Sequence, residues 1–104
     1  MRIEQYGIYE FDLAEEKGLD EPQIEYLAVI SPIEMNDVLQ TVIVAPLCNS
    51  CALTPTTFLI DDITRIRLDQ IYSLKKEYVV RYIDKIKTQK VNSIKKVLEE
   101  MLVK

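Results

Sequence analysis

Two arginines and an aspartate occupy alternate positions within residues 63–70, the segment whose residue types are best suited to chemistry. Arg65, Arg67 and Asp69 project from one face if this segment is an extended strand, because side chains in a strand repeat every second residue. A carboxylate beside a guanidinium can serve acid–base and electrostatic catalysis. The same pair is also common on protein surfaces, so the spacing alone leaves a simple ion pair open.

The composition excludes several common catalytic chemistries. The chain has no histidine, which excludes Ser-His-Asp and Cys-His catalysis. Its two glycines, Gly7 and Gly18, cannot form a glycine-rich phosphate loop. A zinc site built from the two cysteines alone would lack two ligands.

Cys48 and Cys51 form a C-x-x-C pair. A redox pair of this kind opens a helix, whose dipole lowers the thiol pKa, whereas this pair follows an apolar run and leads into a loop-like segment. We therefore expect two small thiols in a strand-end loop. In a reducing compartment we expect no disulfide between them.

The 104 residues carry a net charge of −4, distributed unevenly. Residues 1–25 hold eight acidic and two basic side chains, whereas residues 75–104 hold nine basic and four acidic ones. Net acidity disfavours broad binding to nucleic acid but permits a local basic site. The chain has no apolar run of roughly 20 residues and no signal-peptide core, so we expect a cytoplasmic protein with a single domain over residues 1–104.

Alternating and continuous apolar runs predict a chain built mainly of short strands. We expect loops at residues 14–23 and 48–55, a short helical turn at 33–37 and a turn at Asp61 and Asp62. Pro32 and Pro46 should each close the strand before it, because proline donates no hydrogen bond to a sheet. The expected strands are residues 7–13, 25–31, 40–47, 56–60, 63–68 and 77–87.

One convincing helix is predicted after these strands. Thr88 is a good candidate for its N-cap. The apolar residues that follow fall on one helical face, and they are Val91, Ile94, Leu98, Met101 and Leu102. The expected fold class is mainly β with some helix (α+β): a small, strongly bent barrel with a C-terminal α-helix packed against it.

Four segments, in this order, resemble conserved segments of the Kid/MazF (PemK-like) toxins. They are residues 7–13 (GIYEFDL), 28–32 (AVISP), 41–50 (TVIVAPLCNS) and 67–71 (RLDQI). The resemblance covers nearly the whole chain. It implies an SH3-like β-barrel, a homodimer and a cognate antitoxin. It also implies cleavage of single-stranded RNA without metal or cofactor, in which the 2′-hydroxyl attacks the adjacent phosphate and leaves a 2′,3′-cyclic phosphate.

The resemblance also implies roles for individual residues. Arg67 and Asp69 match the catalytic arginine and aspartate of the Kid branch, with Asp69 as base and Arg67 as proton donor or, more easily, phosphate clamp. Cys48 stands where the family has a hydroxyl, and a thiol is a weaker donor. The residues expected to bind substrate are Cys48, Asn49, Ser50, Arg65 and Gln70.

Some positions depart from the family pattern. Glu25 and Tyr26 stand where the MazF branch has an arginine and a proline, and the loop histidine of the Kid branch is absent. The loop at residues 14–23 is acidic and would repel RNA. Two alternatives therefore stay open: a non-catalytic toxin that blocks a protein such as DNA gyrase, as CcdB does, or a catalytically silenced homologue.

Overall fold

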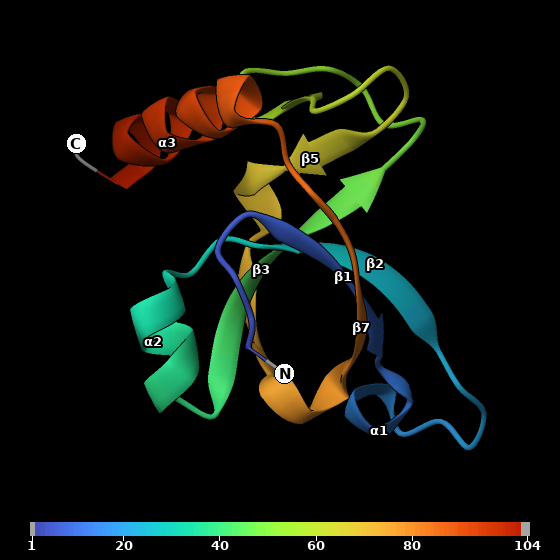
Figure 1. Ribbon diagram of the computed structural model, residues 1–104. Helices are drawn as coiled ribbons and strands as arrows, with labels where there is room; N and C mark the ends of the chain where they lie inside the picture. The colour runs from blue at the N-terminus through green and yellow to red at the C-terminus, as the bar shows by residue number, and fades with distance from the viewer. Residues whose placement is uncertain (1, 103–104) are drawn as a thin grey trace.

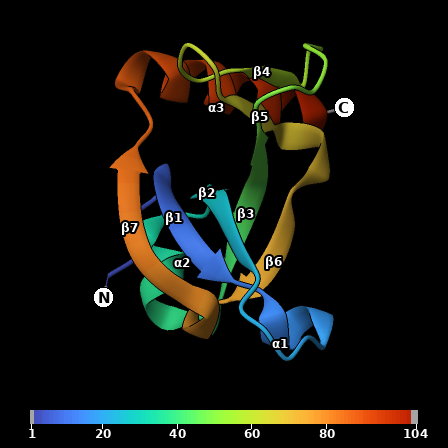
Figure 2. The same ribbon diagram turned by 90° about the vertical axis from the view of Figure 1, so that its right-hand side faces the viewer.

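A computed structural model describes the backbone of residues 2–102 and the side chains of residues 2–101. It confirms a mainly β protein with a C-terminal helix (Figures 1 and 2). No described helix is long and apolar enough to cross a membrane. The strands are β1 (Gly7–Asp12), β2 (Ile24–Val29), β3 (Thr41–Cys48), β4 (Thr57–Leu59), β5 (Arg65–Arg67), β6 (Tyr72–Lys75) and β7 (Val79–Lys85). The helices are α1 (Ala14–Lys17), α2 (Ile33–Val38) and α3 (Thr88–Leu102), and two 3-10 turns are η1 (Leu68–Gln70) and η2 (Lys76–Tyr78).

Strand β3 is the centre of the seven-stranded antiparallel sheet. Six strands follow the order β4-β5-β3-β2-β1-β7, and the seventh, β6, also pairs with β3. One edge of β3 pairs with β2. The other edge pairs first with β6, through residues 41–44, and then with β5, through residues 47 and 48. The sheet bends strongly, so that β7 and β6 face each other across the barrel interior (Figure 2). Among the described residues no strand pairing joins β7 to β6 or β4, so the barrel-like sheet is not closed by a ladder.

Apolar side chains inside the bend form the first core. The strict alternation of buried and half-buried residues along β1 matches the predicted half-buried strand, with Tyr9 and Phe11 inside. Fully buried side chains of β2 and β3 complete this core, and they include Leu27, Val29, Val42 and Val44.

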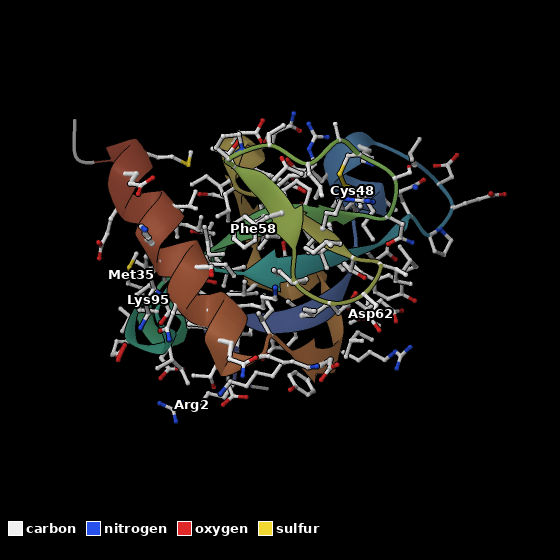
Figure 3. All side chains as sticks on the ribbon, turned by 90° about the horizontal axis from the view of Figure 1, so that it is seen from above. Arg2, Met35, Cys48, Phe58, Asp62 and Lys95 are labelled. Atoms are coloured by element: carbon white, nitrogen blue, oxygen red, sulfur yellow. A yellow bond between two sulfur atoms is a disulfide. The ribbon has the colours of Figure 1, made fainter. Side chains whose placement is uncertain are left out.

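A second core lies between the sheet and α3, which crosses the end of the molecule that holds β4 and β5 (Figures 1 and 3). Ile66 of β5, Leu68 of η1 and Ile94 of α3 are each 0% exposed within it. The predicted apolar face of the helix is confirmed for residues 91, 94, 98 and 101, and Val97 joins it. The side chain of Leu102, also expected on this face, lies outside the described side chains.

Several predicted boundaries are wrong, each for a local reason. Helix α3 begins at Thr88, so this residue is not the N-cap, and the Lys87 carbonyl accepts the bond from the Val91 N–H at 3.0 Å. Strand β6 escaped prediction, and β7 is shorter than expected because η2 occupies residues 76–78. The acidic loop at 14–23 contains the single helical turn α1.

Pro46 does not end β3, which continues to Cys48. The Ile43 carbonyl accepts a bond from Ile30, so residues two apart in this series direct their backbone groups to the β2 side. Pro46 therefore directs its nitrogen to the opposite edge. There the pairing with β6 ends at Val44 and the pairing with β5 starts at Leu47, so no ladder donor is lost.

Candidate active site

Strand β5 presents both of its arginines on one face of the sheet. Ile66, between them, is 0% exposed and packs toward α3, whereas Arg65 and Arg67 are half-buried on the opposite face. The prediction that these two arginines share a face is therefore confirmed. The register adds neighbours on that face, because directly opposite residues of an antiparallel pair point the same way. Thr57 lies opposite Arg67, and Cys48 lies opposite Arg65.

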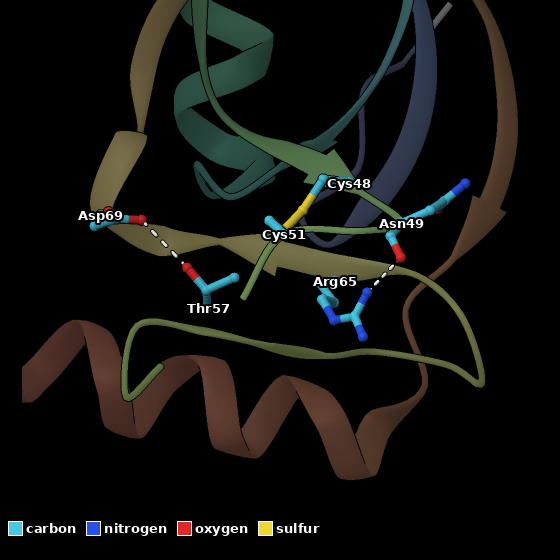
Figure 4. Close-up of a disulfide and its surroundings, with 6 residues drawn as sticks. All are labelled: Cys48, Asn49, Cys51, Thr57, Arg65 and Asp69. Carbon is cyan, nitrogen blue, oxygen red and sulfur yellow. Dashed lines mark hydrogen bonds between the residues drawn. A yellow bond between two sulfur atoms is a disulfide. The ribbon is translucent and has the colours of Figure 1, made fainter. Parts of the chain in front are cut away.

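Asp69 does not continue this strand, contrary to the simplest form of the prediction. The strand ends at Arg67, and Asp69 is the exposed middle residue of η1. The first residue of this turn, Leu68, is buried, and its N–H donates to the Thr56 carbonyl at 2.8 Å. The Thr57 hydroxyl donates to Asp69 Oδ1 at 3.5 Å (Figure 4). Thr57 thus neighbours both residues despite the change from strand to turn: Arg67 is its partner in the strand register, and Asp69 accepts its hydroxyl.

Sequence reasoning missed Thr57. It is 4% exposed, whereas most threonines lie at the surface. Its burial and its place beside Asp69 depend on the pairing of residue 57 with residue 67. Nothing in the local sequence signals this, because the neighbouring Thr56 has the same chemistry and the same β propensity.

At the other end of this face, Arg65 is anchored to the loop that follows β3. Its Nη1 donates to the carbonyl oxygen of Asn49, and its buried Nε has no hydrogen-bond partner among the described residues. Cys48 and Cys51 are joined by a disulfide across a Cα–Cα distance of 6.1 Å (Figure 4). The expectation of two free thiols is therefore wrong for this structure. Residue 48 has no S–H to donate, because the three-residue spacing brings both sulfurs together above β5.

The remaining predicted residues lie at the rim of this face. Asn49 and Ser50 are exposed in the loop beyond β3, and Gln70 is exposed at the end of η1. The Asn49 carbonyl is occupied by Arg65, which leaves its side-chain amide available. Ser50 and Gln70 lie at opposite ends of the β5 segment, so the structure does not gather all the predicted substrate residues at one point.

A cleft of about 450 Å³ opens beside the Cys48 end of this face. Cys48 and Asn49 contribute to its wall, but Arg67 and Asp69 do not. Its other residues include no lysine or arginine; they are Ile8, Glu25, Tyr26, Leu27, Pro46, Leu47, Asp61, Ile63, Thr64, Ile83 and Asp84. The cleft is therefore apolar with carboxylates, which disfavours entry of a polyanion.

Asp61 makes the acidity of this cleft persistent. Its Oδ1 accepts bonds from the backbone N–H groups of Ile63 at 2.9 Å and Thr64 at 2.7 Å. These bonds hold the pKa of the Asp61 carboxyl below its ordinary value, so the group stays charged. Glu25 is partly neutralised by Lys17, whose Nζ lies 2.5 Å from Glu25 Oε2.

The chemistry available on the β5 face is acid–base and electrostatic. Asp69 offers an exposed carboxylate as proton acceptor, and Arg67 offers a guanidinium that can bind a phosphate through two hydrogen bonds. The buried Thr57 hydroxyl donates to the Asp69 carboxylate. Within residues 2–101 no three cysteine or acidic side chains are grouped so as to hold a metal ion.

Comparison with known proteins identifies relatives of this chain by structure and by sequence. Among solved structures, the chain is similar to an endoribonuclease from a mycobacterial species in complex with its cognate antitoxin, with TM-score 0.80, 17% identity, and 96% of this chain and 94% of that chain covered. It is also similar to MazF from Deinococcus radiodurans, with TM-score 0.75, 12% identity, and coverage of 98% and 97%. A third similar structure is the Mycobacterium tuberculosis toxin MazF-mt6, with TM-score 0.69, 13% identity, and coverage of 90% and 93%.

At such low sequence identities, the structural similarity shows a shared fold. No curated protein sequence matches the chain. The sequence profile of the PemK-like, MazF-like toxins of type II toxin–antitoxin systems matches residues 4–102, nearly the entire chain. The chain therefore belongs to the PemK-like, MazF-like toxin family.

Proposed function

We propose that this toxin is an endoribonuclease that cleaves single-stranded RNA, including mRNA, by a metal-independent transesterification on the β5 face. The observation that carries the proposal is that Arg67, by strand register, and Asp69, by a hydrogen bond, both neighbour Thr57 at the end of a strand whose other arginine points the same way. The endoribonucleases among its structural relatives support the same reaction class.

In the proposed step, Asp69 accepts the proton of the ribose 2′-hydroxyl, and the resulting oxygen attacks the adjacent phosphorus. The bond between phosphorus and the 5′-oxygen breaks as the 2′,3′-cyclic phosphate forms. Arg67 binds the non-bridging oxygens and stabilises the charge that develops on them. The leaving 5′-oxygen takes a proton from water, and Asp69 then returns its proton to solvent.

Neighbouring residues are assigned to substrate binding. Two residues along an extended strand span roughly 6.8 Å, which places Arg65 within reach of a phosphate next to the one that Arg67 holds. Asn49 and Ser50, at the Arg65 end, and Gln70, at the Asp69 end, offer neutral groups to bases and ribose. With the disulfide formed, Cys48 contributes surface rather than a donor; reduced, as a reducing cytoplasm would keep it, its thiol is a weak donor.

The proposal includes a homodimer, a cognate antitoxin and a cytoplasmic location, where mRNA is found. A cognate antitoxin is named with one of the structural relatives. An antitoxin that covers Arg65 and Arg67 would silence this chain by excluding RNA.

The test is cleavage of a long single-stranded RNA in the presence of EDTA. Arg67→Ala should lower the rate on the order of 10²–10³-fold, because it removes charge stabilisation. Asp69→Asn should lower it by a similar factor through loss of the base. Arg81→Ala is the matched control, since Arg81 lies on β7 and pairs with Glu10. Unchanged cleavage in both site variants, or loss of cleavage in EDTA, would overturn the proposal.

A second candidate is a toxin that blocks a protein, and the acidic cleft favours it. Glu25, Asp61 and Asp84 repel RNA, whereas exposed Tyr26 and Ile63 offer apolar contact to a protein surface. Inhibition of DNA gyrase supercoiling with RNA left intact would support this function. Activity in neither assay would identify a silenced homologue.

A further inference from the structure

Thr57 is an unusual residue in this fold, because it is polar and almost fully buried. Its exposed fraction is 4%, and a buried hydroxyl is costly unless it finds a partner. The other buried polar side chains in the described residues, Ser31 and Asn36, satisfy each other at 2.5 Å and bond the backbone. The side-chain partner of Thr57 is instead Asp69, an exposed residue.

The position of the Thr57 hydroxyl is fixed by the backbone around it. The Thr57 N–H donates to the Thr54 carbonyl at 3.2 Å, and its carbonyl accepts from the Thr54 N–H at 2.9 Å. Pairing with Arg67 sets its face of the sheet. A β-branched side chain also has few χ1 rotamers. The hydroxyl is therefore a donor of restricted orientation, on the face of the sheet that Arg67 shares and 3.5 Å from Asp69 Oδ1.

Asp69 needs such a donor, because little else constrains its side chain. It stands in the short turn η1, whose backbone is tied down at Leu68 by the Thr56 carbonyl. The carboxylate itself is at the surface, where its χ1 rotamers would otherwise interconvert. A general base must sit within hydrogen-bond reach of the proton that it removes.

We propose that Thr57 is a positioning residue, whose hydroxyl holds the Asp69 carboxylate on the side of the sheet that Arg67 faces. Its kinetic consequence rests on the proposed nuclease function. Thr57 itself is too buried to touch RNA and acts through Asp69. This role adds a residue of β4, Thr57, to the proposed catalytic pair of Arg67 on β5 and Asp69 on η1.

The kinetic test uses RNA cleavage by Thr57→Val, which keeps the shape of the side chain and removes the hydroxyl. We expect kcat to fall about two- to fivefold with KM unchanged, because the hydrogen bond is long at 3.5 Å and therefore weak. Thr57→Ser should restore most of the lost kcat. Thr57→Val should add nothing in an Asp69→Asn background, since no base is left for the hydroxyl to position. Thr56→Val is the control, because the Thr56 hydroxyl meets Thr54 and not Asp69.

A second measurement needs no RNA. Three-bond couplings between the Asp69 carboxyl carbon and the backbone report whether χ1 occupies one rotamer. We expect one rotamer in the wild type and in Thr57→Ser, and averaging in Thr57→Val, with the unfolding temperature near that of the wild type. A single rotamer and full kcat in Thr57→Val would overturn the inference. A single rotamer in a wild type that cleaves no RNA would instead overturn the function and leave the positioning role intact, whereas averaged couplings in the wild type would overturn the positioning role.

Discussion

Truncation of Ile94 to alanine is the sharpest test of how α3 is attached. Ile94 is 0% exposed, whereas the other apolar residues on its face, such as Val91 and Leu98, are only partly buried. Removing a fully buried isoleucine side chain costs about 2–5 kcal/mol, and we expect about 3 kcal/mol for Ile94, which shares its buried cluster with Ile66 and Leu68. For a domain of this size such a loss lowers Tm by roughly 12–24 °C.

Urea titration followed by circular dichroism measures this free energy directly. The midpoint should fall while the slope stays constant, because the same surface is exposed on unfolding. Lys95→Ala is the matched control, since Lys95 is the next residue and is exposed on the outer side of the helix (Figure 3). A loss below about 1 kcal/mol for Ile94→Ala would refute the reasoning, because truncation of a fully buried isoleucine costs at least about 2 kcal/mol. It would mean that α3 is not anchored through Ile94.

Three further predictions concern charge and covalent structure near the cleft. The folded pKa of Asp61 lies below its ordinary value of 3.8, so its stabilising effect is present above that pH and is lost as the pH falls through the folded pKa. The free energies of urea unfolding of Asp61→Asn and the wild type should therefore become equal in acid. A difference between them that stays constant with pH would contradict this. Reduction of the Cys48–Cys51 disulfide should lower the free energy of unfolding by about 2 kcal/mol, as expected for so short a loop. Iodoacetamide should label both cysteines only after reduction. Labelling before reduction would contradict the disulfide. Glu25→Lys should lower the KM for RNA roughly tenfold at low salt, because it replaces a repulsive charge beside the substrate by an attractive one. Glu99→Lys, on α3, is the control and should leave the KM unchanged. Equal effects of the two variants would show that only the net charge matters.

Local patterns were sufficient for the secondary structure that the site uses. The apolar residue Ile66 between two arginines predicted a strand with both guanidinium groups on one face, and that is what β5 presents. The helical spacing of Ile94 and its neighbours predicted the face of α3 that is buried. Both patterns work because the period of the element alone decides which side chains face the core.

Features that depend on distant pairing could not be predicted. Asp69 lies on the turn η1, where the pairing of β5 with β4 ends, and no local pattern encodes the last backbone bond of that pairing, from Leu68 to Thr56, twelve residues earlier. Thr57 reaches Asp69 for the same reason. The acidic cleft joins Glu25 to Asp61 and Asp84 only through the curvature of the sheet. In each case the tertiary arrangement supplies the neighbour.

The attachment of β5 to β3 has a consequence for motion. In the described part of the chain this junction consists of two residue pairs, Leu47 with Ile66 and Cys48 with Arg65, whereas β1 and β2 share five pairs. Segments held by few backbone bonds open locally at lower free energy than the rest of a protein. The amides of β4 and β5 should therefore exchange with solvent sooner than those of β1 and β2. The β4–β5 unit, whose own pairing places Thr57, can therefore shift as a unit on β3 when a chain binds to the face that carries the arginines.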